Sequence, residues 1–163
     1  MSATDEALAA NATYAASFEW GSLPLPPARK LAVLACMDAR LDVHRILGLA
    51  PGDAHVIRNA GGVVSDDAIR SLLISQRLLG TEEIILIHHT GCGMLTFHDD
   101  EVKAQVEEET GVRPPFALEA FGELEGDVRQ SLRRLQKSPY VDASRARGFV
   151  YDVSTGRLQE VTA

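Results

Sequence analysis

Short, uninterrupted apolar runs constrain the fold of this chain more than any other feature. Residues 31–35 read LAVLA, and residues 82–90 read EEIILIHHT. Apolar runs of this length are typical of strands that are covered on both faces, as in a parallel sheet. A third segment, residues 54–62 (AHVIRNAGG), begins as a strand and ends in a Gly-Gly turn. These segments predict the centre of a sheet that is buried on both sides.

Helical patterns separate the predicted strands. Ser65, which two aspartates follow, has the features of a helix N-cap, and apolar residues then recur at helical spacing until Gly80. Residues 98–110 predict an acidic surface helix, and residues 124–135 predict an amphipathic one. Strands that alternate with helices define an α/β protein with a mostly parallel central sheet flanked by helices.

The two ends of the chain predict different additions to this sheet. Residues 4–18 are rich in alanine and predict a helix capped by Thr4, and three prolines follow soon afterwards. We therefore expect residues 1–30 to form an N-terminal helical arm. Residues 148–161 predict two strands joined by a short turn, which would form a C-terminal hairpin at one edge of the sheet.

Length and charge limit the class of protein. The chain has 163 residues, which predicts a single domain over residues 1–163. It carries 16 lysines and arginines against 23 aspartates and glutamates, a formal charge of −7, which disfavours nucleic acid and anionic membrane surfaces as partners. We see neither a signal peptide nor a membrane span, so we expect a cytoplasmic protein whose partner is a small molecule or another protein.

Residues capable of chemistry follow two of the predicted strands. Cys36, Asp38 and Arg40 stand at every second position where the first apolar run ends. If the backbone stays extended there, all three side chains project to the same side. His89 and Cys92 stand three residues apart where the 82–90 strand ends. Because ligands collect beyond the carboxyl ends of parallel strands, we expect the two cysteines, His89 and Asp38 to lie close together.

This set of residue types permits several interpretations. Two thiolates and a neutral imidazole are ligands that Zn²⁺ prefers, with a fourth position left for water or a carboxylate. Free cysteines are also often simply buried, and Cys36 and Cys92 could instead act as a redox pair. Asp38 and Arg40 could be an ordinary surface ion pair. The spacing alone therefore leaves a metal site, a redox site and a purely structural role open.

Three segments resemble the β-class carbonic anhydrases. They are CMDAR (36–40), RNAGG (58–62) and HHTGCGM (88–94), in the order and at the approximate separations seen in that family. Two positions depart from its common pattern. Pro27 stands where many members have a glutamine, and His88 replaces the glycine that usually precedes the liganding histidine. The resemblance points to a short bacterial subgroup that also includes carbonyl sulfide hydrolases.

The resemblance implies a zinc enzyme. Cys36, His89 and Cys92 would be zinc ligands, Asp38 would be the active-site carboxylate or a fourth ligand in a closed state, and Arg40 would be its partner. The implied activity is carbonate dehydratase, the reversible hydration of CO₂ to bicarbonate by zinc-bound hydroxide. The alternatives are hydrolysis of carbonyl sulfide at the same site, or a zinc-binding regulatory protein whose site stays closed. The family also implies a homodimer or a homotetramer.

Overall fold

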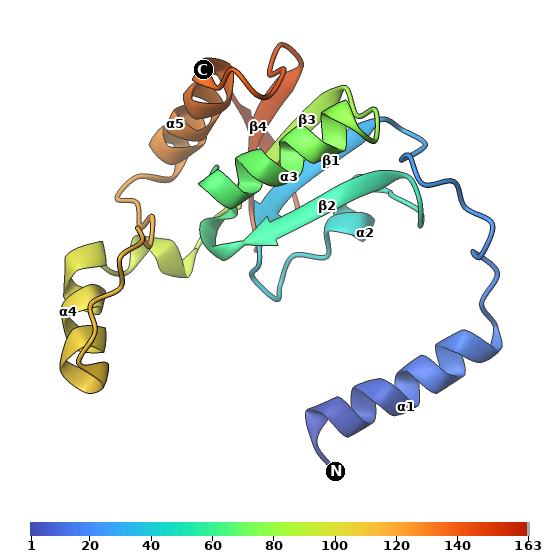
Figure 1. The fold of residues 1–163 in the computed structure, drawn as a ribbon, viewed down its shortest axis with the longest axis horizontal. Coiled ribbons are helices and arrows are strands. Elements are labelled where there is room, and N and C mark those ends of the chain that lie inside the picture. Colours follow the sequence, from blue (N-terminus) through green and yellow to red (C-terminus); the bar gives the residue numbers. More distant parts are fainter. Residues whose placement is uncertain (163) are drawn as a thin grey trace.

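A five-stranded sheet forms the centre of the computed structural model, which describes residues 1–162. The strand order is β2-β1-β3-β4-β5, with the first four strands parallel and β5 antiparallel to β4 (Figure 1). The strands are β1 (Leu31–Cys36), β2 (Ala54–Asn59), β3 (Glu83–His89), β4 (Ala146–Tyr151) and β5 (Leu158–Val161). The predicted α/β class, the mostly parallel sheet and the C-terminal hairpin are confirmed.

Helices cover both faces of this sheet unequally. They are α1 (Ala3–Ala16), α2 (Val43–Leu47), α3 (Asp66–Arg77), α4 (Asp99–Thr110) and α5 (Leu124–Lys137). Helices α3 and α5 pack on one face, where Leu72 and Val128 belong to the same buried cluster as Leu34. The opposite face packs against α2 and the loops around the strand ends. The sequence did not predict α2, because five residues are too few to show helical periodicity.

Strand β1 runs through the middle of the molecule. Ala32 and Leu34 belong to the cluster on the α3–α5 face, whereas Val33 and Ala35 belong to the cluster on the other face. All four side chains are fully buried. The alternation follows from the two-residue period of a strand, and it explains why the run is apolar at every position.

The N-terminal arm lies apart from the sheet (Figure 1). Every residue from 1 to 26 is exposed, and Pro27 is the first buried one. Ser2, not the predicted Thr4, caps α1, because its hydroxyl accepts a hydrogen bond from the Asp5 amide while the Asp5 carboxylate accepts one from the Ser2 amide. No helix within residues 1–162 has the length and apolar character that crossing a membrane requires.

Candidate metal centre

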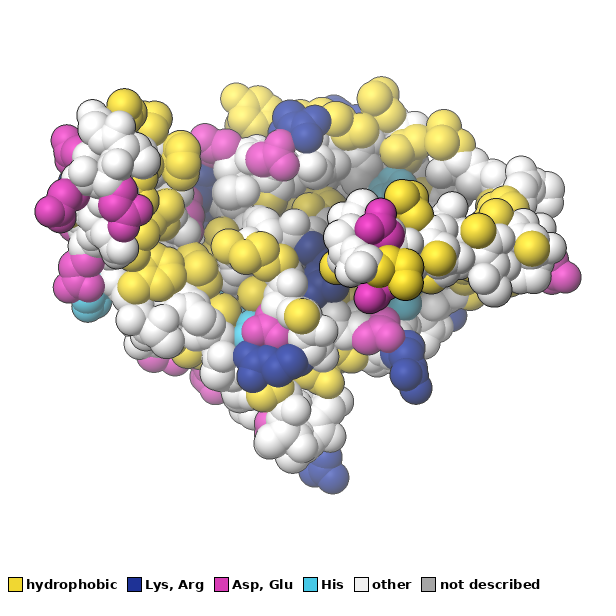
Figure 2. All heavy atoms as spheres, turned by 90° about the horizontal axis from the view of Figure 1, so that it is seen from below, with side chains coloured by type: hydrophobic (Ala, Val, Ile, Leu, Met, Phe, Trp, Pro, Cys, Tyr) yellow, Lys and Arg dark blue, Asp and Glu magenta, His cyan; other side chains and the backbone are white. Residues whose placement is uncertain are grey.

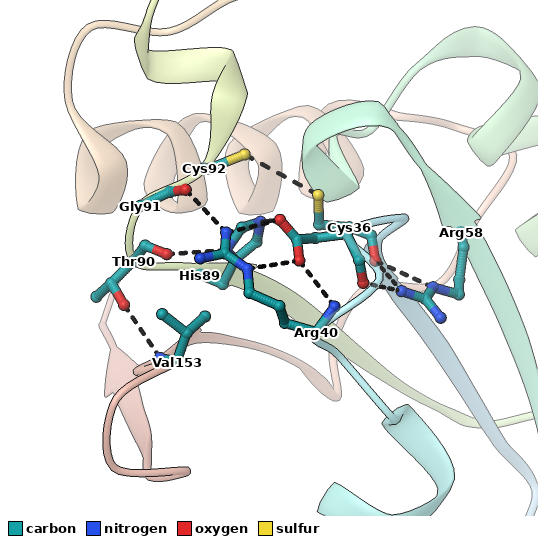
Figure 3. Close-up of polar contacts among 9 residues, drawn as sticks. Cys36, Arg40, Arg58, His89, Thr90, Gly91, Cys92 and Val153 are labelled. Atoms are coloured by element: carbon teal, nitrogen blue, oxygen red, sulfur yellow. Dashed lines mark hydrogen bonds and ion pairs between the residues drawn. The ribbon is translucent and has the colours of Figure 1, made fainter.

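Two thiols and an imidazole meet at the carboxyl ends of β1 and β3. The ligand atoms of Cys36, His89 and Cys92 all lie within 4.8 Å of one another, and all three residues are buried. The two Sγ atoms are 4.0 Å apart (Figure 3). Because β1 and β3 are parallel neighbours, with Ala35 paired to Ile87, the strand ends that carry these residues adjoin.

Glycines allow the chain to close around these residues. Gly62, with φ +69°, lies so close to β1 and β3 that an added Cβ would stand 2.8 Å from both the Cys36 nitrogen and the Ile87 oxygen. Gly91, with φ +63°, turns the chain after β3 so that Cys92 faces back toward Cys36. A side chain at position 62 would push these strand ends apart.

The adjacent histidines of β3 face opposite sides of the sheet. His89 points toward the two thiols, whereas His88 Nε2 bonds to Asp127 Oδ2 of α5 at 2.7 Å. Both imidazoles are fully buried. Strand periodicity therefore separates two chemically identical side chains into different environments.

The three donors fit a zinc ion. Tetrahedral coordination with Zn–S bonds of about 2.3 Å would place two sulfurs about 3.8 Å apart, close to the 4.0 Å between these thiols. His89 Nδ1 donates to the Thr90 carbonyl at 2.9 Å, so the neutral ring has its lone pair on Nε2. That Nε2 is buried and has no hydrogen-bond partner among residues 1–162. A metal ion would satisfy this otherwise costly buried acceptor.

Asp38 lies beside this group but is bound to Arg40 instead. The guanidinium donates from Nε to Oδ1 at 2.9 Å and from Nη2 to Oδ2 at 2.7 Å, and Nη2 also donates to the Gly91 carbonyl at 3.0 Å. Asp38 Oδ2 is 3.6 Å from His89 Nε2. Hydrogen bonds from the Arg40 side chain and amide hold the pKa of Asp38 well below its usual range, so this carboxylate stays ionised.

The route by which Asp38 meets Arg40 corrects the sequence argument. The spacing predicts an extended backbone through Arg40, but β1 ends at Cys36 and a turn follows. The Asp38 carboxylate accepts from the Arg40 amide at 2.9 Å, and the Asp38 carbonyl accepts from the Leu41 amide at 3.0 Å. Aspartate side chains favour such turns because they can bond to the backbone two residues on. The turn, and not the alternation of side chains along a strand, therefore brings the Asp38 carboxylate to Arg40.

The two thiols differ electrostatically. Burial raises the pKa of Cys36, but the neighbouring His89 side chain and the Asp38 and Gly61 amides outweigh it, so the net pKa is lowered. Burial also raises the pKa of Cys92, and the nearby Cys36 raises it further, so its net pKa lies above the ordinary value. In the protein alone, Cys36 is therefore the thiol that ionises first.

A largely apolar hollow of about 420 Å³ opens onto the two thiols. Its lining includes Met37, Met94 and Phe97 beside the Asp38 side chain. Sequence reasoning did not single out these apolar residues, because methionine and phenylalanine give no signal that separates a pocket wall from a core. The hollow can admit a small molecule of little polarity to the donor group.

Arg58 is a further residue at this site, and residue spacing alone assigns it no role. It follows the centre of β2 within the RNAGG segment, and its guanidinium donates to the main-chain carbonyls of Cys36 and Asp38. Contacts with carbonyl groups of another strand leave no signature in residue spacing.

Comparison with known proteins places this α/β architecture and its Cys-His-Cys group in a family. A model of the carbonic anhydrase family matches residues 31–114. β-Carbonic anhydrase 1 of Mycobacterium tuberculosis is 59% identical over 163 residues, covering 99% of both chains. A crystal structure of carbonic anhydrase from Streptococcus mutans superposes with a TM-score of 0.92 at 43% identity, covering 99% of each chain. The chain belongs to the β-carbonic anhydrase family.

A more distant relative bears a different name. Carbon disulfide hydrolase of Saccharolobus solfataricus is 54% identical over 78 residues, which are 48% of this chain and 38% of that protein. That sequence alignment covers about half of the present chain.

Proposed function

We propose that the protein is a zinc-dependent carbonic anhydrase that interconverts CO₂ and bicarbonate. The observation that carries the proposal is the Cys36–His89–Cys92 group with an ionised carboxylate held beside it by Arg40. Zn²⁺ bound by these donors would lower the pKa of water from about 15.7 toward 7 and so supply a nucleophile at neutral pH. Family membership supports the same reaction.

The residues around the donors would have separate roles. Asp38, ionised and within reach of the group, would accept a hydrogen bond from the attacking water and so orient its free lone pair toward carbon. Its low pKa makes it a poor general base. Arg40 would keep the carboxylate away from the metal's fourth position through its bidentate contact. The apolar wall that includes Met94 and Phe97 would receive CO₂, which has no strong hydrogen-bonding groups.

A second candidate is hydrolysis of carbonyl sulfide or carbon disulfide at the same site. The apolar hollow favours it, because these molecules are linear, small and weakly polar like CO₂. The partial similarity to a carbon disulfide hydrolase supports it as well. The third alternative, a regulatory protein with a closed site, is disfavoured by the bonding of Asp38 to Arg40.

One preparation can test all three functions. Metal content per chain is measured first, and CO₂ hydration is then followed by stopped flow beside sulfide release from carbonyl sulfide and carbon disulfide. We expect about one zinc per chain and rapid CO₂ turnover. Sulfide release without CO₂ hydration would overturn the primary proposal in favour of the second. Stoichiometric zinc without turnover of any of the three substrates would favour the closed regulatory site.

We also propose that the protein is a homodimer or homotetramer in the cytoplasm. The exposed arm supports self-association, because it carries Tyr14, Phe18 and Trp20 without burying any of them. Large apolar side chains gathered on one projecting segment mark an interaction surface. In Figure 2 this arm projects to one side, opposite the acidic helix α4.

A further inference from the structure

The guanidinium of Arg58 bridges two carbonyls of the segment that carries Cys36 and Asp38 (Figure 3). Arg58 Nε and Nη2 donate to the Cys36 oxygen at 3.0 and 2.9 Å, and Nη2 also donates to the Asp38 oxygen at 2.7 Å. Arg58 stands on β2 opposite Ala35 of β1. Its side chain therefore reaches from a neighbouring strand to the point where β1 ends.

Strands β1 and β2 both end beside the contacts that Arg58 makes. The Met37 amide donates to the Asn59 oxygen at 2.8 Å, and β2 then gives way to the glycine turn at residues 60–62. The pairing of β1 with β2 ends at Cys36 and Asn59, so these strands do not hold the main chain at Asp38. The rigid guanidinium plane, with five N–H donors, can hold two carbonyls at a set separation, which a flexible single donor cannot do.

We propose that Arg58 is a positioning residue of the metal centre, which fixes the main chain that carries the Cys36 thiol and the Asp38 carboxylate. This inference rests on the zinc site proposed above. The two arginines would divide the task, since Arg40 binds the Asp38 side chain and Arg58 binds its main chain.

A purely stabilising arginine would leave the donor geometry unchanged, and this difference defines the test. Arg58→Ala, Arg58→Lys and a control, Arg29→Ala, are compared for Zn²⁺ affinity by chelator competition and for the absorption spectrum of the Co²⁺-loaded protein. Arg29 is a matched control because its guanidinium also donates to a carbonyl, that of Gly48 at 3.1 Å, away from the metal centre. Neither measurement depends on turnover, so both remain valid if CO₂ hydration is absent.

We expect Arg58→Ala to weaken zinc binding by about tenfold to a hundredfold and to alter the Co²⁺ spectrum, as loss of groups that orient metal ligands does. Arg58→Lys should recover part of the loss, because an ammonium group can still donate to one carbonyl. Lysine also serves as the test variant if the alanine variant does not fold.

Three outcomes would overturn the proposal. The first is an Arg58→Ala protein with an unaltered Co²⁺ spectrum and a zinc affinity within about threefold of that of the unchanged protein. The second is an Arg29→Ala protein that loses as much zinc affinity as Arg58→Ala. The third is an Arg58→Lys protein that recovers none of the zinc affinity lost in Arg58→Ala.

Discussion

The metal centre and the N-terminal arm are opposite cases of how a segment obtains its structure. Cys36, His89 and Cys92 are buried, and they come together from the ends of β1 and β3, beside the glycine turn that follows β2. The arm buries no side chain before Pro27. Its helix depends on local signals, namely alanine-rich sequence and the Ser2–Asp5 capping box.

This difference separates a region that contacts within the chain support from a region that buries no side chain of its own. A helix of 14 residues that buries none of its side chains is marginal in water, and the proposed oligomer would supply the packing that supports α1. The centre, by contrast, has an intramolecular reason for each donor. We therefore expect changes at the centre to act on chemistry and changes in the arm to act on assembly.

The largest effect should follow loss of a thiol. Cys36→Ser or Cys92→Ser should abolish zinc binding and CO₂ hydration, because a hydroxyl does not replace a thiolate ligand, and should also lower stability. Elemental analysis and stopped flow measure the two effects, with the same analyses on Ser17→Ala in the arm as a control. Full zinc occupancy in both serine variants would refute the ligand assignment.

Arg40→Ala should impair catalysis while the metal stays bound. Without its bidentate partner, Asp38 is free to occupy the fourth metal position, so kcat/KM should fall by about tenfold to a hundredfold. The control is Arg70→Ala, which removes an ion pair of similar length, to Asp67 at 2.8 Å, on an exposed helix surface. CO₂ hydration by Arg40→Ala near the unchanged rate at neutral pH would contradict this role.

Removal of residues 1–26 should convert the oligomer to monomers and leave the sheet folded. Residues 27–30 are kept because the Ala28 and Arg29 amides donate to the Gly52 and Asp53 carbonyls, each at 2.9 Å. Sedimentation velocity measures the change, and Glu6→Gln in the full chain serves as a control that leaves the apolar side chains in place. An unchanged, stable oligomer after truncation would show that the arm does not mediate assembly.

The smallest expected effect is the loss of a helix cap, which we compare between α3 and α1. Ser65→Ala removes the bond to the Ala68 amide at the start of the packed helix α3, and should lower the unfolding free energy by about 1 kcal/mol at any protein concentration. Ser2→Ala should have a comparable effect only at concentrations at which the oligomer forms. Urea unfolding at several protein concentrations tests both. If Ser2→Ala lowers the unfolding free energy equally at every protein concentration, α1 is stabilised within one chain and not by the oligomer.

Sequence was a good guide to segments with strong local patterns. The apolar runs gave the central strands, and Ser65 caps α3 as expected, although the helix ends at Arg77, before the predicted glycine stop. Cys36, His89 and Cys92 meet as expected because the carboxyl ends of parallel strands lie at the same edge of the sheet. The turn after Cys36 and the role of Arg58 depend on main-chain carbonyls, which residue types do not reveal.

The back-to-back histidines of β3 have a consequence for how this chain tolerates insertions and deletions. Residues 84–87 are apolar on both sides, so hydrophobicity alone would accept the strand shifted by one position. Such a shift would turn Thr90 or His88 toward the thiols and leave Asp127 facing a side chain other than His88. The His88–Asp127 bond, on the face of the sheet remote from the thiols, thus forms only when β3 has the register that turns His89 toward them. A single-residue insertion or deletion in the 78–82 loop can be absorbed only if the loop, and not the strand, changes its path.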